Sequence, residues 1–290
     1  MTRESVDQVV LAPEARRRAV IDLIDGARER LRISVFRCDD REVLQTLAAA
    51  VRRGVRVDAL VTGRAKGSKV NLRLLRLLLE HIGVHVVRYR DRTTKYHGKY
   101  MVVDGHAALV GSINLTRKCF DKTSDFVVVS RDGRVVAALT ALFDADCRLG
   151  PTPSVGVLAP RVVVGPDHAR ARILKILGAA RRSIRIVDRK LGDEEVLQVL
   201  VDRARAGVDV RIVQQKRVAG LVSHGRLLIV DDRTAVIGSM ALSTRHLDHR
   251  REVALVVDDR AAVGELVSFF DEAASEVCLS GPALLAESVA

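Results

Sequence analysis

The sequence contains little that would stack on nucleic-acid bases or cross the hydrophobic part of a membrane. It has no tryptophan and only 3% aromatic residues, which argues against a platform that stacks the bases of a single strand. No run approaches the roughly 18 apolar residues of a membrane span. The N-terminal segment also lacks the apolar stretch of a signal peptide. We therefore expect a cytoplasmic protein that is at most peripheral to a membrane.

Cysteine is scarce and scattered along the chain. The four cysteines, Cys38, Cys119, Cys147 and Cys278, form no Cys-x-x-Cys pair. This spacing argues against a structural zinc site and favours free buried thiols in a reducing compartment. His246 and His249 have a spacing that occurs in metal sites, but they lack a clear third ligand, so we expect both at the surface. The sequence predicts neither a metal nor another cofactor.

Acidic residues are outnumbered by basic ones. The 48 lysines and arginines exceed the 36 aspartates and glutamates, which leaves a net charge of +12. Such a charge favours anionic partners, including nucleic acid and an acidic lipid surface. The excess is almost all arginine and can also reflect genome base composition, so the charge alone does not select a partner.

A set of polar residues occurs twice in the same order, 127 positions apart. Each copy has a histidine, a cation two positions later, an aspartate five further on, a Gly-Ser pair and finally an acidic residue. The copies are His97, Lys99, Asp104, Gly111-Ser112 with Asn114, and Asp125, then His224, Arg226, Asp231, Gly238-Ser239 with Ala241, and Glu252. We expect a chain with two such sets to bring them together at one site.

Short apolar, β-branched runs carry both histidines. Residues 96–103 and 223–230 are typical of buried strands, and alternation along a strand would place each histidine and its cation on one face. Asp104 and Asp231 have the opposite parity, so we expect them to tie a strand end or loop. The two Gly-Ser turns could present a hydroxyl and backbone N–H groups to an anion.

Two histidines and two cations around one phosphate suit phosphoryl transfer through a covalent intermediate. A neutral imidazole attacks phosphorus, the cations hold the non-bridging oxygens, and the second imidazole donates a proton to the leaving alkoxide. Asp125 and Glu252 would orient the rings through their other nitrogens. Lys99 and Arg226 supply the positive charge, so this scheme requires no metal.

These residues resemble the phospholipase D superfamily, whose signature is His-x-Lys-x4-Asp followed by Gly-Ser-x-Asn. The first copy matches fully, whereas the second has Arg226 in place of lysine and Ala241 in place of asparagine. The resemblance implies an α/β fold of two α/β/α sandwich repeats, packed as a pseudo-twofold pair with the site between them. It also implies a phosphohistidine intermediate, with His97 as nucleophile and His224 as general acid.

The repeat extends beyond the motifs and divides the chain. We expect a first repeat over residues 1–150, with the complete motif, and a second, shortened repeat over 151–290, joined at the proline-rich segment 151–166. Each repeat reads as helix, strand, helix, strand, with strands predicted over residues 31–36, 55–61, 183–187 and 208–213. This alternation favours a mostly parallel sheet in each half.

The two halves differ in the segment that precedes the histidine. His97 lies 43 residues after Gly54, but His224 lies only 17 after Gly207. The longer segment fits an additional helix over residues 71–81 and a strand over 84–89. This leucine-rich helix is expected to face the core, with a position on a membrane as the alternative. The trimmed second half would either open the cleft to a large substrate or indicate decay of the site.

The sequence is compatible with three functions. The first is a phospholipase D-type hydrolase or phosphatidyl transferase on phospholipid. The second is a metal-independent nuclease of the same superfamily, and the third is a catalytically weak module that binds phosphate or nucleic acid. Residues around the first motif resemble the lipid enzymes, and the lack of a membrane span favours a hydrolase. We expect a monomer that acts on a phospholipid or another phosphodiester and touches an anionic membrane or nucleic acid peripherally.

Overall fold

The computed structural model describes residues 5–63, 69–91, 93–148, 154–274 and 279–280. Helices of the first half are α1 (Pro13–Gly26), α2 (Arg41–Arg52), α3 (Lys69–His81), α4 (Arg117–Lys122) and α5 (Gly133–Asp146). Its strands are β1 (Asp7–Val10), β2 (Arg30–Val35), β3 (Arg56–Val61), β4 (His85–Arg88), β5 (Lys95–Tyr96), β6 (Tyr100–Val103), β7 (Ala107–Gly111), β8 (Thr123–Ser124) and β9 (Val127–Ser130).

The second half repeats this order with fewer elements before its motif. Its helices are α6 (Ala169–Gly178), α7 (Glu194–Arg205), α8 (Thr244–Asp248) and α9 (Arg260–Ala274). Its strands are β10 (Val162–Val164), β11 (Ser183–Val187), β12 (Asp209–Val213), β13 (Arg217–Val218), β14 (Leu221–Ser223), β15 (Leu227–Val230), β16 (Thr234–Gly238), β17 (Arg250–Arg251), β18 (Val253–Val257) and β19 (Leu279–Ser280).

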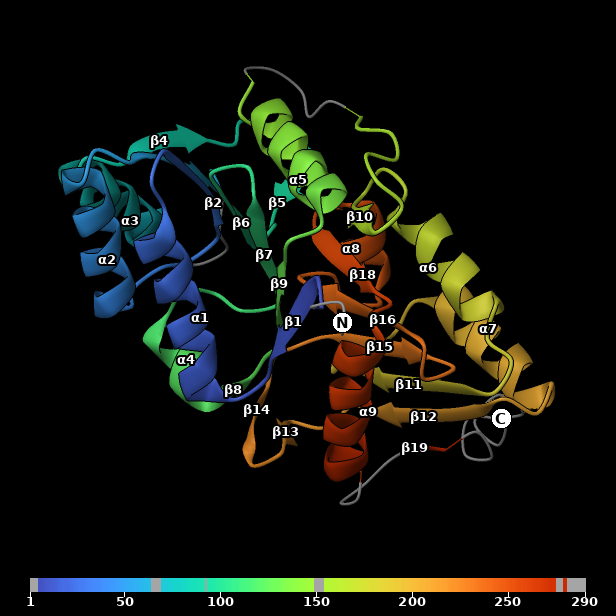
Figure 1. Cartoon of the computed structure of the whole chain (residues 1–290). Coiled ribbons are helices and arrows are strands. Elements are labelled where there is room, and N and C mark those ends of the chain that lie inside the picture. The colour runs from blue at the N-terminus through green and yellow to red at the C-terminus, as the bar shows by residue number, and fades with distance from the viewer. Residues whose placement is uncertain (1–4, 64–68, 92, 149–153, 275–278, 281–290) are drawn as a thin grey trace.

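Each half builds one seven-stranded sheet. The orders are β1-β9-β7-β6-β2-β3-β4 and β10-β18-β16-β15-β11-β12-β19, so corresponding strands occupy corresponding places (Figure 1). The last place differs, because the C-terminal strand β19 lies where the first sheet has β4. The second sheet therefore keeps seven strands although its sequence is shorter.

The expectation of mostly parallel sheets is wrong. Only β2, β3 and β4 are parallel neighbours in the first sheet, and only β11 and β12 in the second. The remaining pairs are antiparallel. Two of them are hairpins in which the motif strand turns back at once into the next strand, β6 into β7 and β15 into β16. Connections of this length join antiparallel strands, whereas parallel strands need a long crossover.

The motif aspartates hold the turns at which these strands end. The Asp104 carboxylate accepts hydrogen bonds from the backbone N–H groups of residues 28, 29 and 30. The Asp231 carboxylate accepts the equivalent three from residues 181, 182 and 183. Burial favours a higher pKa for both aspartates, but these hydrogen bonds outweigh it and lower the pKa. Each aspartate thereby fixes the start of the neighbouring strand, β2 or β11.

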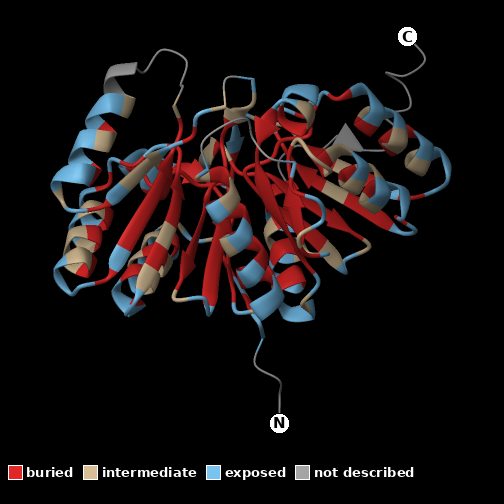
Figure 2. Ribbon diagram, turned by 90° about the horizontal axis from the view of Figure 1, so that it is seen from above, coloured by how far each residue is buried: buried red, intermediate tan, exposed pale blue. Residues whose placement is uncertain are grey.

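The sheets are covered by helices on both faces. Helices α1, α2 and α3 cover the outer face of the first sheet, and α6 and α7 cover that of the second (Figure 1). Between the sheets, α5 and α9 contribute Phe143 and Phe270 to one apolar core that draws on both halves. The strands are buried while the helices expose their outer sides (Figure 2). The fold is thus the paired α/β/α arrangement that the sequence predicts.

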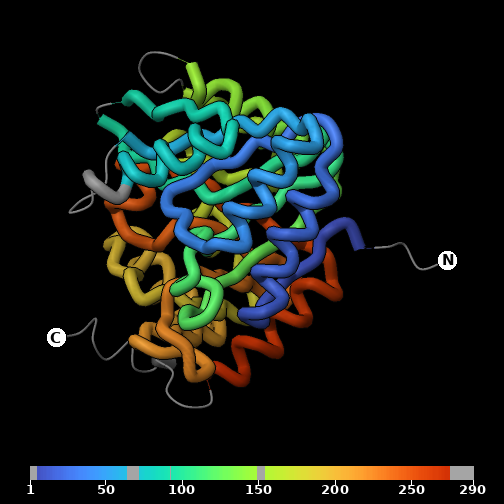
Figure 3. Tube along the Cα trace, turned by 90° about the vertical axis from the view of Figure 1, so that its left-hand side faces the viewer, coloured from blue at the N-terminus to red at the C-terminus, as the bar shows by residue number. Residues whose placement is uncertain are grey.

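Elements from early and late in the sequence, β1 and α9, meet at this shared core. Strand β1 forms the edge of the first sheet and contacts α9 of the second half, as Figure 3 also shows. Residues 149–153 lie outside the described residues, so the boundary at residue 150 stays a prediction. Cys278 also lies outside them, whereas Cys38 and Cys119 are buried free thiols and Cys147 is partly buried.

The pseudo-twofold relation extends to ion pairs that no motif predicts. In each half, one arginine of the first helix bridges two aspartates, one at the N-cap of the second helix and one in the short helix after the Gly-Ser turn. These groups are Arg17 with Asp40 and Asp121, and Arg170 with Asp193 and Asp248. The repeat is therefore preserved in side-chain contacts as well as in topology.

One fully buried ion pair joins the two halves. Arg251 of β17 and Asp146 at the end of α5 have no exposed side-chain surface, and Arg251 Nε lies 3.1 Å from Asp146 Oδ1. Arg251 also lies 3.1 Å from Asp167 Oδ2. Burial raises the pKa of Asp146 to about 7, although the charge of Arg251 opposes this shift. The pair is thus fully charged only above neutral pH.

We predict that Asp146→Ala lowers the free energy of unfolding at pH 8.5 by about 3–5 kcal/mol. The substitution leaves the buried guanidinium of Arg251 with only one of its two carboxylate partners, Asp167. Asp144→Ala is the matched control, since Asp144 is exposed and pairs with Arg32 at the surface. It should cost less than about 1 kcal/mol. Urea denaturation of both variants measures the difference, and equal losses would contradict a structural role for the buried pair.

Candidate active site

Both motif histidines lie where a predicted strand is interrupted. The expected continuous strands over 96–103 and 223–230 are wrong, because residues 97–99 separate β5 from β6 and residues 224–226 separate β14 from β15. At each break the backbone pairs with the other half of the chain. Strand β5 runs parallel to β17, and β14 runs parallel to β8. Each motif is thereby inserted into the opposite repeat.

Backbone hydrogen bonds hold the inserted residues. The His97 N–H donates to the carbonyl oxygen of Arg251 at 2.9 Å, and the Gly225 N–H donates to that of Ser124 at 2.7 Å. A Cβ atom at Gly225 would lie 2.6 Å from the Phe126 ring and 2.9 Å from Ser124 O. Only glycine fits at this close approach, which explains the residue after the second histidine.

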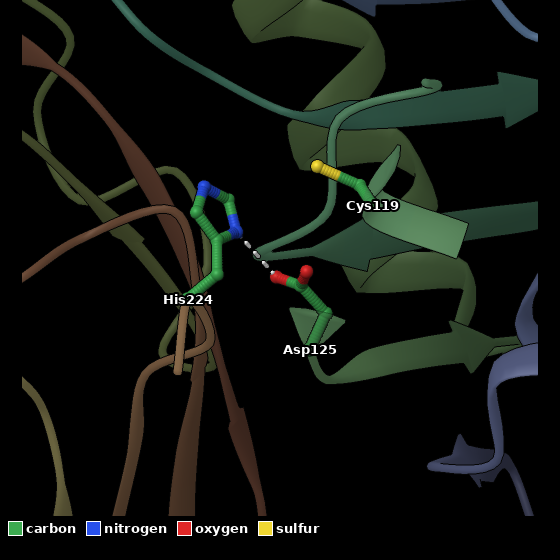
Figure 4. Close-up of side chains that lie close together, drawn as sticks. All are labelled: Cys119, Asp125 and His224. Carbon is green, nitrogen blue, oxygen red and sulfur yellow. Dashed lines mark hydrogen bonds and ion pairs between the residues drawn. The ribbon is translucent and has the colours of Figure 1, made fainter. Parts of the chain in front are cut away.

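The orienting carboxylates are exchanged between the halves. His97 Nδ1 lies 3.0 Å from Glu252 Oε1, and His224 Nδ1 lies 2.8 Å from Asp125 Oδ1 (Figure 4 shows the second pair). Each histidine is thus oriented by the acid of the other repeat. A carboxylate on Nδ1 holds the ring in one orientation and leaves Nε2 to meet a substrate. His224 is the more accessible ring, with 28% of its side chain exposed against 10% for His97.

The two cations occupy equivalent places. Lys99 Nζ donates to the carbonyl oxygen of His97 at 3.0 Å, and Arg226 donates to that of His224 at 2.6 Å. Arg226, which stands where the superfamily signature has lysine, therefore makes the same hydrogen bond to the backbone as Lys99 does. Lys99 Nζ also lies 3.1 Å from both ring nitrogens of His97. Positive charge is concentrated directly at the edge of this ring.

The surroundings keep His97 neutral and weaken the proton affinity of Lys99. Burial lowers the pKa of His97 well below its usual value, and the charges of Lys99, Arg226 and Arg250 act in the same direction. A neutral imidazole has the lone pair that a nucleophile needs. Burial also lowers the pKa of Lys99 to about 7, with Arg226 adding to the shift and Glu252 opposing it. The charge of Arg226 in the second motif therefore lowers the pKa of both groups of the first motif.

The Gly-Ser turns do not offer backbone N–H groups to an anion, contrary to the sequence-based expectation. The Ser112 N–H donates to Phe126 O at 3.0 Å, and the Ser239 N–H donates to Val253 O at 2.9 Å. Gly111 and Gly238 permit this close strand pairing, since a Cβ atom at Gly238 would overlap Val253 O and Ala254 Cα. Both serine side chains are fully buried.

Ser112 instead takes part in holding Asp125. Its hydroxyl donates to Asp125 Oδ1 at 2.5 Å, and the Thr123 hydroxyl donates to Oδ2 at 2.5 Å. Burial alone would raise the pKa of Asp125, but the charge of His224 and these hydrogen bonds outweigh it and lower the pKa. In the second half, the Ser239 hydroxyl donates to Val253 O at 3.3 Å. The two acids are thus supported differently.

A buried arginine fixes the backbone that carries Asp125. Arg16 of α1 has no exposed surface, and its guanidinium donates to Thr123 O at 2.8 Å and to Asp125 O at 3.1 Å. Sequence reasoning missed this residue. Arg16 stands in a run of three consecutive arginines that the sequence does not distinguish, and only the packing of α1 shows that Arg16 points inward.

Three potential metal ligands gather around Asp125. Ligand atoms of Cys119, Asp125 and His224 lie within 4.8 Å of one another (Figure 4). Both oxygens of Asp125 already accept hydrogen bonds, however, and its Oδ1 faces the ring nitrogen of His224. The carboxylate is therefore satisfied as an orienting group. The chemistry of this set fits a hydrogen-bonded histidine better than a metal centre.

The second half has a corresponding group around Glu252. His246 stands 127 positions after Cys119, its Nε2 lies 3.9 Å from Glu252 Oε1, and its ring centroid lies 6.2 Å from that of His97. The expectation of a surface position for His246 is wrong, because it is buried and accepts a hydrogen bond from Arg250. Burial lowers its pKa to about 3. His249 is exposed, as expected.

A pocket of about 700 Å³ leads from the surface to His224. Asn114 lies in its wall with Oδ1 buried and without a hydrogen-bond partner among the described residues, so this oxygen is available to a ligand. The corresponding Ala241 is fully buried and adds no polar group. Phe36 lines the pocket on one side and contacts the His97 ring on the other, with centroids 4.6 Å apart. No motif in the sequence indicated Phe36.

Comparison with known proteins agrees with this geometry. The family described as "Cardiolipin synthase, PLD-like domain" matches residues 20–147 and 213–274, which include both histidine motifs. The chain belongs to this phospholipase D-like family. Cardiolipin synthase A of Pseudomonas aeruginosa is 32% identical over 127 residues, which are 43% of this chain and 26% of that protein. The chain thus matches about a quarter of this curated relative.

Two solved structures share the fold of this phospholipase D-like chain. Polyphosphate kinase from Porphyromonas gingivalis superposes with a TM-score of 0.73 at 19% identity, over 91% of this chain and 46% of the kinase. Phosphatidylserine synthase from Haemophilus influenzae gives 0.66 at 11% identity, over 95% and 87%. Among the described residues, none of the helices is sufficiently long and apolar to span a bilayer.

We predict that the site binds sulfate and loses affinity as pH rises through about 7. The folded-state pKa of Lys99 is lowered to about 7, so the lysine is charged below this pH and neutral above it. Sulfate keeps a constant charge in this range, and loss of one proton weakens its binding by at most about tenfold per pH unit. Isothermal titration calorimetry at pH 6 to 9 measures the change.

Substitutions at Lys99 provide the control for this titration. Lys99→Arg should keep its sulfate affinity as pH passes through 7, because a guanidinium stays charged there. Lys99→Met should bind weakly at every pH. An unchanged decline in the arginine variant would assign the titration to another group.

Proposed function

We propose that this chain cleaves the phosphodiester bond of a phospholipid and passes the phosphatidyl group through His97 to an acceptor hydroxyl. The observation that carries this proposal is the crosswise pairing of two histidines with two carboxylates around shared cations. One ring is buried and neutral, which suits a nucleophile. The other ring is partly exposed and paired with an acid, which suits a proton donor and acceptor.

In the first step, His97 Nε2 attacks phosphorus and forms a P–N bond. The bond from phosphorus to the head-group oxygen breaks, and this oxygen takes a proton from His224 Nε2. Lys99 and Arg226 bind the non-bridging oxygens, while Asp125 stabilises the charged form of His224. Glu252 lies against Nδ1 of His97 and favours the tautomer that carries its proton there, which leaves the lone pair of Nε2 for attack.

In the second step, the acceptor hydroxyl gives its proton to His224 and attacks the same phosphorus. The P–N bond breaks, and its electron pair returns to His97. Water as acceptor completes hydrolysis, and an alcohol completes transfer. Both reactions use the same residues, so the acceptor rather than the histidine pair decides between them.

Two observations support a lipid substrate. The pocket that reaches His224 has leucines 72, 74, 75 and 78 along one wall, and such a surface suits acyl chains better than nucleotides. Cardiolipin synthase A and phosphatidylserine synthase, which this chain resembles, are named for phospholipid products. Those names support the transferase reaction in particular. Vesicles of phosphatidylglycerol, single-stranded DNA and double-stranded DNA offered to the protein in parallel test the substrate class, and turnover of DNA alone would overturn the proposal.

We predict that His97→Ala abolishes an acid-labile, base-stable phosphoenzyme. His224→Ala should still form it with bis-p-nitrophenyl phosphate, because p-nitrophenol is acidic enough to leave without a donated proton. For a lipid head group the same variant should be slower by about 100-fold or more, the usual contribution of a general acid. Quenched-flow labelling and peptide mapping measure both quantities.

A matched control is His106→Ala, since His106 is an exposed histidine of the turn between β6 and β7. This variant should form the phosphoenzyme at the wild-type rate. Phosphate mapped to His224 in the wild-type protein would reverse the two roles, and its absence from both histidines would refute the covalent mechanism.

We also predict that turnover survives EDTA, because Lys99 and Arg226 supply the charge that a metal ion would otherwise supply. Hydrolysis of bis-p-nitrophenyl phosphate with and without chelator measures this. Cys119→Ser removes the sulfur from the only group of three potential ligands among the described residues, and its activity should be equally insensitive. Activity lost in EDTA and restored by a divalent ion would contradict the mechanism.

A further inference from the structure

Helix α3 is apolar on two sides. Leu75 and Leu79 are buried and pack in the core of the first half, as the sequence predicts. Leu74, Leu77 and Leu78, however, are 52%, 46% and 48% exposed. A helix that only covers a core would carry polar residues at these positions. The prediction of a purely core-facing helix is therefore incomplete.

The exposed leucines form one patch. Positions 74, 77 and 78 lie three and four residues apart and so share one side of the helix. Among the described residues, only five large hydrophobic side chains are exposed, and three of them are these leucines. Figure 1 places α3 at the outer edge of the first sheet, beside α2. We call Leu74, Leu77 and Leu78 the leucine patch.

The leucine patch is continuous with the candidate active site. Leu74, Leu77 and Leu78 lie together on a shallow, open part of the α3 surface, next to Glu80 and His81. Leu74 and Leu78 also line the pocket that reaches Asn114 and His224. An apolar chain lying on the patch would therefore lead into the pocket that holds the proton-donating histidine.

The pocket wall is also cationic. Arg37, Lys118 and Arg189 line it, against one acidic residue, Asp39. Two of these cations come from the first half and one from the second. Positive charge above an apolar surface matches the anionic head group and acyl chains of an acidic phospholipid, whereas nucleic acid would match the charge alone.

The second half has no equivalent of α3. Residues 214–224, all of them described, contain only the short strands β13 and β14 where the first half has a helix and a strand. The second sheet is nevertheless complete. Helix α3 therefore stands on only one side of the pseudo-twofold site. A ligand that reaches the site from that side passes a helix that the other side lacks.

We infer that the leucine patch inserts into the surface of an anionic membrane and delivers a phospholipid, acyl chains along α3, to the pocket at His224. This inference rests on the proposed function for what happens to the lipid afterwards. Binding to the membrane does not depend on catalysis, so it can be measured separately. The occupant is an acidic glycerophospholipid within a bilayer.

The test compares vesicle binding by the wild-type protein and by the variant Leu74→Gln, Leu77→Gln, Leu78→Gln. Glutamine keeps helix propensity and removes the apolar surface. In cosedimentation with vesicles of phosphatidylglycerol and phosphatidylcholine, the variant should lose at least about tenfold in affinity. Val157→Gln is the matched control, since Val157 is 66% exposed and belongs to the segment between α5 and β10 rather than to α3, and it should bind like the wild type.

Additional measurements distinguish an error in the membrane-binding inference from an error in the proposed function. The wild type should bind vesicles of phosphatidylcholine alone more weakly, and the triple variant should lose more turnover on vesicles than on bis-p-nitrophenyl phosphate. Equal vesicle binding by triple variant and wild type would overturn the inference, as would an equal loss of both activities. Vesicle binding without any phosphodiester turnover would support the leucine patch and refute the proposed function. Circular dichroism of the triple variant confirms that it is folded.

Discussion

The exchange of orienting carboxylates between the two halves is the constraint on which the site depends. His97 and His224 each take their acid from the opposite repeat, so neither ring is oriented until the halves are packed together. The surrounding structure serves this requirement. Strands β5 and β14 leave their own sheets to pair with β17 and β8, and the buried contact between Arg251 and Asp146 fixes the same junction. The site is therefore complete only when the two halves are packed against each other.

The pseudo-twofold frame also explains which side chains surround each histidine. Cys119 and His246 occupy equivalent positions beside the two acids, and Thr123 and Arg250 precede those acids by the same two residues. In the first half, the hydroxyl groups of Ser112 and Thr123 support Asp125. In the second half, the Arg250 guanidinium and the neutral His246 ring lie near Glu252. This difference gives one histidine a strongly positive, buried environment and the other an accessible one. The division of roles in the proposed mechanism follows from that asymmetry.

Much of this arrangement could be predicted from the sequence because the motif is repeated in register. The offset of 127 residues identified both histidines, both cations and both acids, and the apolar patterns located β2, β3, β11 and β12 to within one residue at each end. Parallel sheets were predicted wrongly, since alternation of helix and strand does not show where a strand folds back through a short turn. Arg16, Phe36 and Arg250 were missed because only packing turns them toward the site. His246 could have been found by applying the offset to Cys119.

A single repeat of this kind could orient its own histidine only by pairing with another copy of itself. The present chain carries both copies, and because they are parts of one chain they need not be identical. Each acid constrains only the histidine across the interface, and each sheet edge can be closed by a different strand, β4 or β19. The described parts of the two halves differ accordingly: α3 occurs only in the first, and the second has Arg226 and Ala241 where the first has Lys99 and Asn114. A site built from two unlike halves of one chain can therefore bind the two sides of its substrate in different ways.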